Sequence, residues 1–179
     1  MTVLSALAKL ARLMSPDLPQ RIEPARLADA ESHLQGKLNT DAMQRLKDLI
    51  LDPSGPVELD LAFGRDERGV IRITGDYRVN VSLRCQRCLE LMEMTLSNPF
   101  NIGLVPPDGS GDRISGEFEP IIMEGSAIEL LTLVEDELLL ALPMSAVHAL
   151  EDCPAAEDVR ERAPKKPNPF EVLKKIKSQ

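Results

Sequence analysis

The sequence is poor in the residues on which several common protein classes depend. It has no tryptophan, one tyrosine and four phenylalanines, so we expect no platform of aromatic rings that stacks bases. Its three cysteines cannot pair completely, which disfavours a disulfide-stabilised secreted domain. No run of 18 apolar residues occurs, so we expect no membrane-spanning helix. Lys9 and Arg12 interrupt the apolar N-terminal segment, which disfavours a secretory signal, and we expect a cytoplasmic protein.

Charge is distributed unevenly along the chain. The net charge of −8 excludes a uniformly basic nucleic-acid coat, because contact with phosphates needs a positive surface. Six arginines nevertheless collect between residues 65 and 87, and five lysines against one acid follow Ala163. Residues 117–137 carry seven acids and no base. Any contact with a polyanion is therefore expected to be local.

The hydrophobic pattern changes its period along the chain and predicts an α+β domain. Apolar residues spaced by three and four predict helices within residues 18–52 and from the capping box Ser126–Glu129 to Leu142. Between these helices, alternation of apolar and polar residues predicts five strands, at 57–63, 70–73, 77–85, 92–96 and 100–104. Gly75 and Asp76 are expected to break the chain between the second and third strands. Short connections favour antiparallel pairing, so we expect a small antiparallel β-sheet or a partly open barrel, flanked by helices.

The chain divides into three parts on this pattern. Residues 1–17 are an N-terminal extension, residues 18–150 form the α+β domain, and residues 151–179 join a flexible linker to a short basic C-terminal helix. Asn168 suits the cap of that helix and Pro169 its first position. A helix of about two turns is marginal alone, so its apolar residues must dock either on the domain or on a partner.

Four of the five cysteine and histidine residues stand in two close pairs. Cys85 and Cys88 follow the predicted strand 77–85, and His148 and Cys153 follow the predicted helix. Thiolate and imidazole ligands at these spacings suit a closed, tetrahedral zinc site. Two other interpretations stay open: small buried cysteines beside a locally packed histidine, and a redox-active dithiol. The redox interpretation is the weakest, because the motif follows a strand in a β-rich stretch and not within a βαβ unit.

Charged side chains offer two further candidate surfaces. Arg78 and Arg84 share the polar face of one predicted strand, about 20 Å apart at ~3.3 Å per residue, and Arg87 lies in the turn that follows. They could contact phosphates and position an RNA without reading its sequence; the alternative is a solvated face paired with nearby acids. For Glu135, Asp136 and Glu137 a solvated helix face is favoured over a magnesium site, because consecutive helical residues point in different directions.

Several of these motifs occur together in a known order. They are Ile22–Ala28, Cys85–Cys88, Leu133–Pro143 followed by His148 and Cys153, and Asn168–Leu173. In this combination they resemble the YceD family, the large ribosomal RNA subunit accumulation proteins of bacteria and plastids. The resemblance implies a non-enzymatic role in the synthesis, processing or stability of 23S ribosomal RNA.

Two hypotheses about partners follow, with a thiol oxidoreductase as a third. The first is a factor that contacts 23S rRNA or its precursor through basic side chains, namely Arg78, Arg84, Arg87, Lys165, Lys166, Lys174 and Lys175. The second is a protein adaptor whose acidic helix and C-terminal motif recruit a basic ribosomal protein or an RNA-processing nuclease. In both, zinc at Cys85, Cys88, His148 and Cys153 would be structural.

Overall fold

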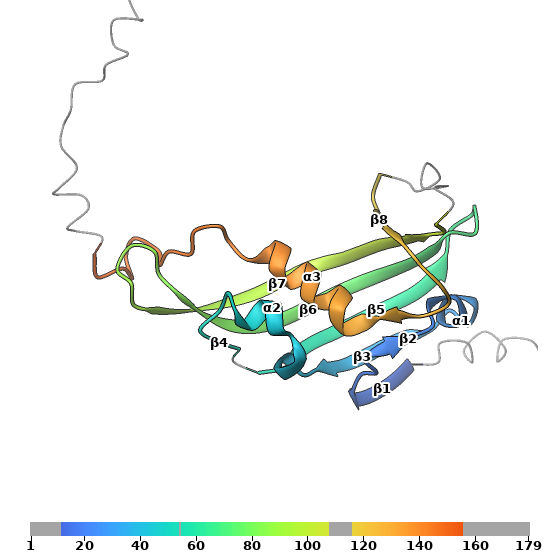
Figure 1. The fold of residues 1–179 in the computed structure, drawn as a ribbon, viewed down its shortest axis with the longest axis horizontal. Helices are drawn as coiled ribbons and strands as arrows, with labels where there is room; N and C mark the ends of the chain where they lie inside the picture. Colours follow the sequence, from blue (N-terminus) through green and yellow to red (C-terminus); the bar gives the residue numbers. More distant parts are fainter. Residues whose placement is uncertain (1–11, 54, 108–115, 156–179) are drawn as a thin grey trace, which may run out of the picture.

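A long, twisted sheet with helices on one face dominates the computed structural model, which describes residues 12–53, 55–107 and 116–155 (Figure 1). Six strands follow one another in the order β1-β3-β5-β6-β7-β8, and β4 pairs with β6. Their bounds are β1 Arg12–Asp17, β3 His33–Leu38, β4 Asp52–Pro53, β5 Val57–Arg65, β6 Ile71–Arg84, β7 Leu91–Val105 and β8 Glu119–Ile122. A separate two-stranded sheet pairs β2, Arg21–Ile22, with β9, Ile128–Glu129.

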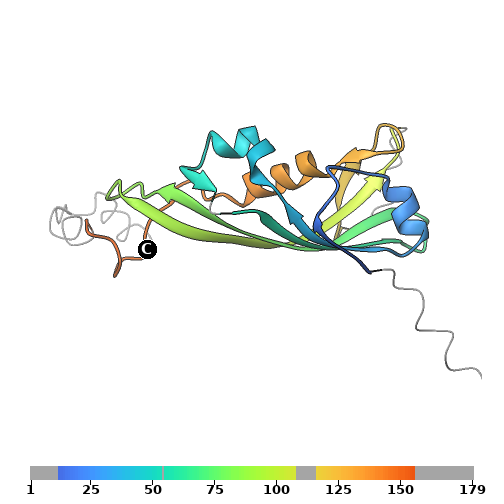
Figure 2. The same cartoon turned by 90° about the horizontal axis from the view of Figure 1, so that it is seen from below.

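The helices cover one face of this open sheet, as the nearly edge-on view in Figure 2 shows for α2 and α3. The helical elements are α1 Pro24–Asp29, the 3-10 helix η1 Thr40–Ala42, α2 Gln44–Lys47 and α3 Leu130–Ala141. No helix in the described ranges is long and apolar enough to cross a membrane. The predicted α+β class is confirmed. The central pairs β3–β5, β5–β6 and β6–β7 are antiparallel, as expected, whereas β1–β3 and β7–β8 are parallel.

The longest structural unit is the antiparallel hairpin of β6 and β7, which pair from Ile71 with Leu104 to Arg84 with Leu91. Its residues form these strands because alternate side chains enter the core under the helices: Tyr77, Val79 and Val81 are buried, while the residues between them face away. The alternation predicted for residues 77–85 is therefore confirmed, except at Ser82, which was expected on the polar face but is buried.

The break predicted at Gly75 and Asp76 is wrong, because β6 runs through both residues. Gly75 has φ +153°, and a Cβ atom on it would lie 1.9 Å from the carbonyl oxygen of Asp60 on β5. Glycine is therefore required here for close approach of the two strands, and the strand continues. The separate strands predicted at 92–96 and 100–104 are likewise one strand, β7.

Two helix predictions also need correction. Residues 33–38 were expected to be helical but form β3, because they pair with β5 and with β1, and Leu34 and Leu38 enter the core. The capping box Ser126–Glu129 does not form. Ile128 and Glu129 pair with β2 instead, so α3 begins at Leu130, whose N–H donates to the carbonyl oxygen of Gln20 at 2.7 Å.

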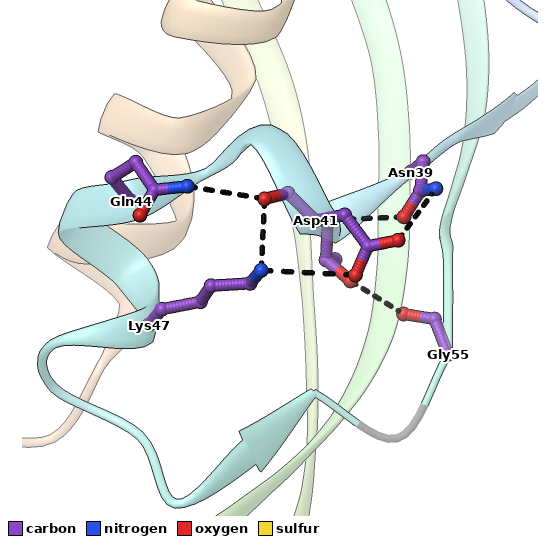
Figure 3. A network of polar contacts seen from close by, with 6 residues as sticks. Asn39, Asp41, Gln44, Lys47 and Gly55 are labelled. Carbon is purple, nitrogen blue, oxygen red and sulfur yellow. Dashed lines mark hydrogen bonds and ion pairs between the residues drawn. The ribbon is translucent and has the colours of Figure 1, made fainter.

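Polar contacts around Asp41 hold the turn that leads into α2 (Figure 3). The side chain of Asn39 accepts a hydrogen bond from the Asp41 N–H at 2.9 Å and donates one to its carboxylate at 2.9 Å. The side chains of Gln44 and Lys47 donate to the Asp41 carbonyl oxygen at 3.2 and 2.8 Å. These bonds fix α2 relative to β3, at one end of the sheet.

Glu135 fastens α2 to α3, and the solvated position predicted for it is wrong. The side chain is buried, and its carboxylate accepts hydrogen bonds from the backbone N–H of Leu46 at 3.1 Å and from Nε of Arg45 at 3.0 Å. Arg45 also donates to Asp136 at 2.6 Å. The first N–H groups of a helix have no partner within it, so an acceptor from α3 satisfies the N–H of Leu46.

Candidate metal centre and its surroundings

The four predicted ligands meet at the turn between β6 and β7. The hairpin extends beyond β5, which pairs with β6 only as far as Arg78, and reverses direction at residues 85–90. The chain that follows α3 runs back to the same turn (Figure 1). The N–H of Gln86 donates to the carbonyl oxygen of Ala146 at 2.8 Å, which joins the two segments. Residues about 60 positions apart in sequence thus become neighbours.

The turn itself has the shape that two cysteines spaced by three need in order to face one centre. The N–H of Cys85 donates to the Glu90 carbonyl oxygen and the N–H of Leu89 to the Cys85 carbonyl oxygen, both at 2.9 Å. Leu89 has φ +65°, a left-handed conformation that glycine adopts most easily. Its side chain is 63% exposed, so burial does not offset this strain. This conformation could not be predicted from the sequence, because the residue is not a glycine.

The ligand atoms of Cys85, Cys88, His148 and Cys153 all lie within 4.8 Å of one another. Cys88 Sγ lies 3.3 Å from His148 Nδ1. Cys85 and Cys153 are buried, Cys88 and His148 are half-buried, and none of the three cysteines is in a disulfide. In a tetrahedral site with zinc–sulfur bonds of about 2.3 Å, neighbouring sulfurs lie about 3.8 Å apart. The observed cluster therefore fits such an ion after a small contraction.

The cysteine environment favours a cation at the centre. Burial of the Cys85 thiol opposes ionisation, but the N–H groups of Cys88, His148 and Arg87 donate to its sulfur and outweigh burial, so its pKa is lowered to about 5. The pKa of Cys88 is raised, first by burial and then by the neighbouring sulfurs of Cys85 and Cys153. Ionising all three sulfurs would place like charges side by side, and a divalent cation removes that repulsion.

His148 is oriented to offer one nitrogen to the centre. Its Nε2 lies 3.2 Å from the carbonyl oxygen of Leu91 on β7. A carbonyl oxygen only accepts, so this contact assigns the ring proton to Nε2 and leaves the lone pair of Nδ1 directed at the cysteines. A backbone carbonyl in this position is the usual partner that holds a histidine ligand.

The predicted arginines do not converge on one site. Arg78 is exposed near the middle of β6, across from Glu58, which pairs with Lys37 at 2.9 Å. Arg84 is exposed at the end of β6. Arg87 is half-buried in the turn, and its Nη1 has no hydrogen-bond partner among the described residues. Arg84 and Arg87 therefore flank the cysteine cluster, and Arg78 lies in a surface of mixed charge. Lys165, Lys166, Lys174 and Lys175 lie outside the described residues.

One further cation shares the strand face of Arg78 and Arg84 but was not among the predicted site residues. Arg72 lies six positions before Arg78 on the continuous strand β6, so all three are on the same face. Its guanidinium lies 5.7 Å from the ring centre of Phe118 and donates to the Arg65 carbonyl oxygen at 3.0 Å. The expected break at Gly75 hid this alignment.

The described part of the chain is strongly acidic as a whole. It carries 23 aspartates and glutamates against 12 lysines and arginines. Residues 116–155 contribute nine of these acids and no lysine or arginine. Most of the surface would therefore repel a polyanion and attract a basic partner.

Comparison with known proteins gives two matches and one absence. The family model described as "Large ribosomal RNA subunit accumulation protein YceD" matches residues 73–177. A curated relative from Haemophilus influenzae, named Large ribosomal RNA subunit accumulation protein YceD, is 30% identical over 169 residues, which cover 90% of this chain and 97% of the relative. No solved structure matches the chain.

Proposed function

The chain belongs to the YceD family of large ribosomal RNA subunit accumulation proteins, and we propose that it supports the accumulation of 23S rRNA as a non-enzymatic, cytoplasmic factor built around a structural zinc ion. The observation that carries the proposal is the cluster of four ligand atoms within 4.8 Å at the end of the β6–β7 hairpin. Four protein ligands complete a tetrahedron and leave no open position for a substrate or an activated water. Zinc here would hold the hairpin turn against the segment after α3.

Elemental analysis of protein purified without chelator tests the metal. We expect about one zinc per chain, as in closed Cys3His sites. The His148→Ala variant should lose the metal, whereas His33→Ala, which removes the only other histidine, should keep it. Less than about a tenth of an equivalent in the unmodified protein would contradict a four-ligand site. Bound zinc also leaves no free dithiol, so this measurement separates the metal site from a redox role.

Contact with 23S rRNA or its precursor is the second part of the proposal. Arg84 and Arg87 supply positive charge beside the cluster, and the C-terminal lysines Lys165, Lys166, Lys174 and Lys175 would add to it. Arg78 is a weaker candidate, because Glu58 lies across from it.

The test is the salt dependence of binding to fragments of 23S rRNA, measured by fluorescence anisotropy. We expect the double variant Arg84→Gln/Arg87→Gln to bind more weakly and to reduce the slope of log K against log salt by about 1.4, since each phosphate contact on a single strand contributes about 0.7. Arg65→Gln/Arg68→Gln removes the same charge from the opposite end of β6 and should change neither quantity. Equal losses in both double variants would contradict a local RNA contact.

A protein adaptor is the second candidate, favoured by the excess of acids in the described part of the chain. Its partner would be a basic ribosomal protein or an RNA-processing nuclease, attracted by the acidic surface of α3 and its flanking segments. Absence of salt-sensitive RNA binding, together with capture of such a protein by the pure chain, would favour this candidate over direct RNA contact.

A further inference from the structure

Exposed apolar side chains concentrate at the end of the molecule that carries the cysteine cluster. Nine large apolar side chains are exposed in the described ranges, and only Ile122, on β8, lies elsewhere. The other eight come from the α2–β4 connection, the hairpin turn and the chain near the end of α3: Leu49, Leu51, Leu89, Leu91, Leu140, Met144, Val147 and Leu150. Single exposed apolar residues need no explanation, but a contiguous group of them marks an interaction surface.

Part of this surface is hollowed into a groove of about 470 Å³. One wall is the segment Asp48–Leu51 after α2, and the other is formed by Leu139, Leu142 and Met144 at and beyond the end of α3. In Figures 1 and 2, α2, β4 and the chain after α3 lie over the same end of β6 and β7. Leu49 is 62% exposed and Met144 is fully exposed, so no described residue covers these apolar side chains. The lining also includes the polar residues Asp48, Arg84 and Gln86.

We propose that this groove binds the chain's own C-terminal segment, residues 168–177, which lies outside the described residues. The described chain ends at Ala155, which packs against the cluster of Cys85 and Cys153. Gln86 and Ala146, which hydrogen-bond to each other beside that cluster, both line the groove. Twelve residues separate Ala155 from Asn168, and a flexible chain of that length spans about 20 Å on average. The segment is therefore tethered close to the groove.

The sequence of the segment complements the groove in polarity. Phe170, Leu173 and Ile176 recur every three residues, which places them on one side of a helix. A helix this short is unstable alone, so it gains most from an apolar surface to pack on. Three lysines accompany these residues: Lys174, Lys175 and Lys177. Two exposed acids can meet them, because Asp48 lines the groove and Asp52 directly follows Leu51, which also lines it.

A second groove, of about 340 Å³, does not fit the same segment. It lies at the opposite end of β6, where Arg65 and Arg68 form part of its lining beside Met123 and Pro106. Both charged residues of its lining are arginines, which would repel a segment rich in lysine, whereas Asp48 offsets the single arginine, Arg84, in the lining of the first groove. The second groove also lies farther along β6 from the chain end at Ala155. Charge and tether therefore both favour the groove beside the cysteine cluster.

The tether strengthens even a weak contact. A short flexible connection gives an effective concentration on the order of 1 mM, so a separate peptide that binds with a Kd of about 100 µM would correspond to about ten docked chains for each undocked one. The measurable quantity is thus the affinity of the segment supplied as a peptide.

The experiment uses the full chain and a full-length variant, Phe170→Ala/Leu173→Ala, in which the segment cannot dock. The methyl resonance of Met144 should differ between the two proteins, and addition of a synthetic peptide of residues 168–179 to the variant should restore its position. Identical Met144 resonances would overturn the proposal. A difference that grows with protein concentration would overturn it too, because the occupant would then be a second copy of the chain.

Two matched substitutions in the Phe170→Ala/Leu173→Ala background locate the binding surface. Leu49 and Ile122 are both 62% exposed, so neither Leu49→Glu nor Ile122→Glu removes a core contact. We expect Leu49→Glu to raise the Kd of the peptide at least about tenfold, because it places a charge in an apolar contact. Ile122→Glu should change this Kd less than about twofold. Equal effects of the two substitutions would overturn the assignment to this groove. No RNA is present, so the result is independent of the proposed function.

Discussion

Replacement of Glu135 by alanine tests how α2, and with it one wall of the groove, is held on α3. Three donors reach this carboxylate: the Leu46 N–H at 3.1 Å, and Nε and Nη2 of Arg45 at 3.0 and 2.9 Å. Arg45 keeps an acceptor after the substitution, because Asp136 lies 2.6 Å from its Nη1. The Leu46 N–H loses its acceptor, Glu135 Oε1, and the Leu46 side chain is fully buried. The stability loss should therefore arise mainly at Leu46.

The expected loss can be assembled from these contacts. A buried N–H left without an acceptor costs about 1–3 kcal/mol, and truncation of a buried side chain adds about 1 kcal/mol for the space left behind. We expect Glu135→Ala to lower the free energy of unfolding by about 2–4 kcal/mol, a large fraction of the roughly 5–15 kcal/mol that is typical of a domain. Glu135→Gln should cost less, because the amide oxygen still accepts from Leu46.

Urea unfolding followed by circular dichroism measures the loss, provided that the slope of free energy against urea is unchanged. The control is Asp136→Ala, which removes an acid whose side chain is half exposed and bonded to the same arginine. That control should cost no more than about 1 kcal/mol, as exposed ion pairs do. Native-state hydrogen exchange at Leu46 should accelerate in Glu135→Ala alone. Equal costs for the two alanine variants, or an unchanged Leu46 amide, would refute the reasoning.

Two further predictions concern the hairpin. Chelation of zinc should lower the melting temperature and accelerate hydrogen exchange at residues 85–90 and 146–153, but not in α1, because only the former segments are joined by the ligands. Gly75→Ala should destabilise the fold by about 3–5 kcal/mol, since its Cβ would meet the Asp60 carbonyl oxygen and φ is unfavourable. Gly64→Ala, with no atom within 4 Å of its Cβ, should cost less than about 1 kcal/mol in the same urea titration.

The strands of the hairpin could be predicted because burial and backbone period agree along them. Residues 77–85 alternate in the sequence as they alternate in burial, except at the buried Ser82, so local information was sufficient. At Gly75 local information was not sufficient. Whether a glycine ends a strand or lets another strand approach depends on Asp60, which no window around residue 75 contains. Residues 33–38 were misassigned for the same reason, because their pairing with β5 overrides a weak helical pattern.

The candidate site and its surroundings could likewise be predicted only in part. Cys85, Cys88, His148 and Cys153 could be named from sequence because cysteine and histidine are rare in this chain and their spacing restricts the chemistry. The role of Glu135 could not, because this residue is one of several acids in α3 and its partners Arg45 and Leu46 lie about 90 residues away in sequence. The left-handed conformation of Leu89 also carries no sequence signal. A sequence pattern alone does not predict contacts between segments that are far apart in the sequence.

Contact with RNA and docking of the C-terminal segment would reinforce each other, if both occur. The described surface is acidic, but Arg84 lines the groove, so a docked segment would bring Lys174 and Lys175 near it and create a positive patch that neither part forms alone. Phe170→Ala removes no charge, yet it should weaken binding to 23S rRNA fragments, whereas Lys174→Gln/Lys175→Gln should weaken it with a reduced salt slope. If Phe170→Ala changed the chemical shift of the Met144 methyl group but left RNA affinity unchanged, the lysines would act independently of docking.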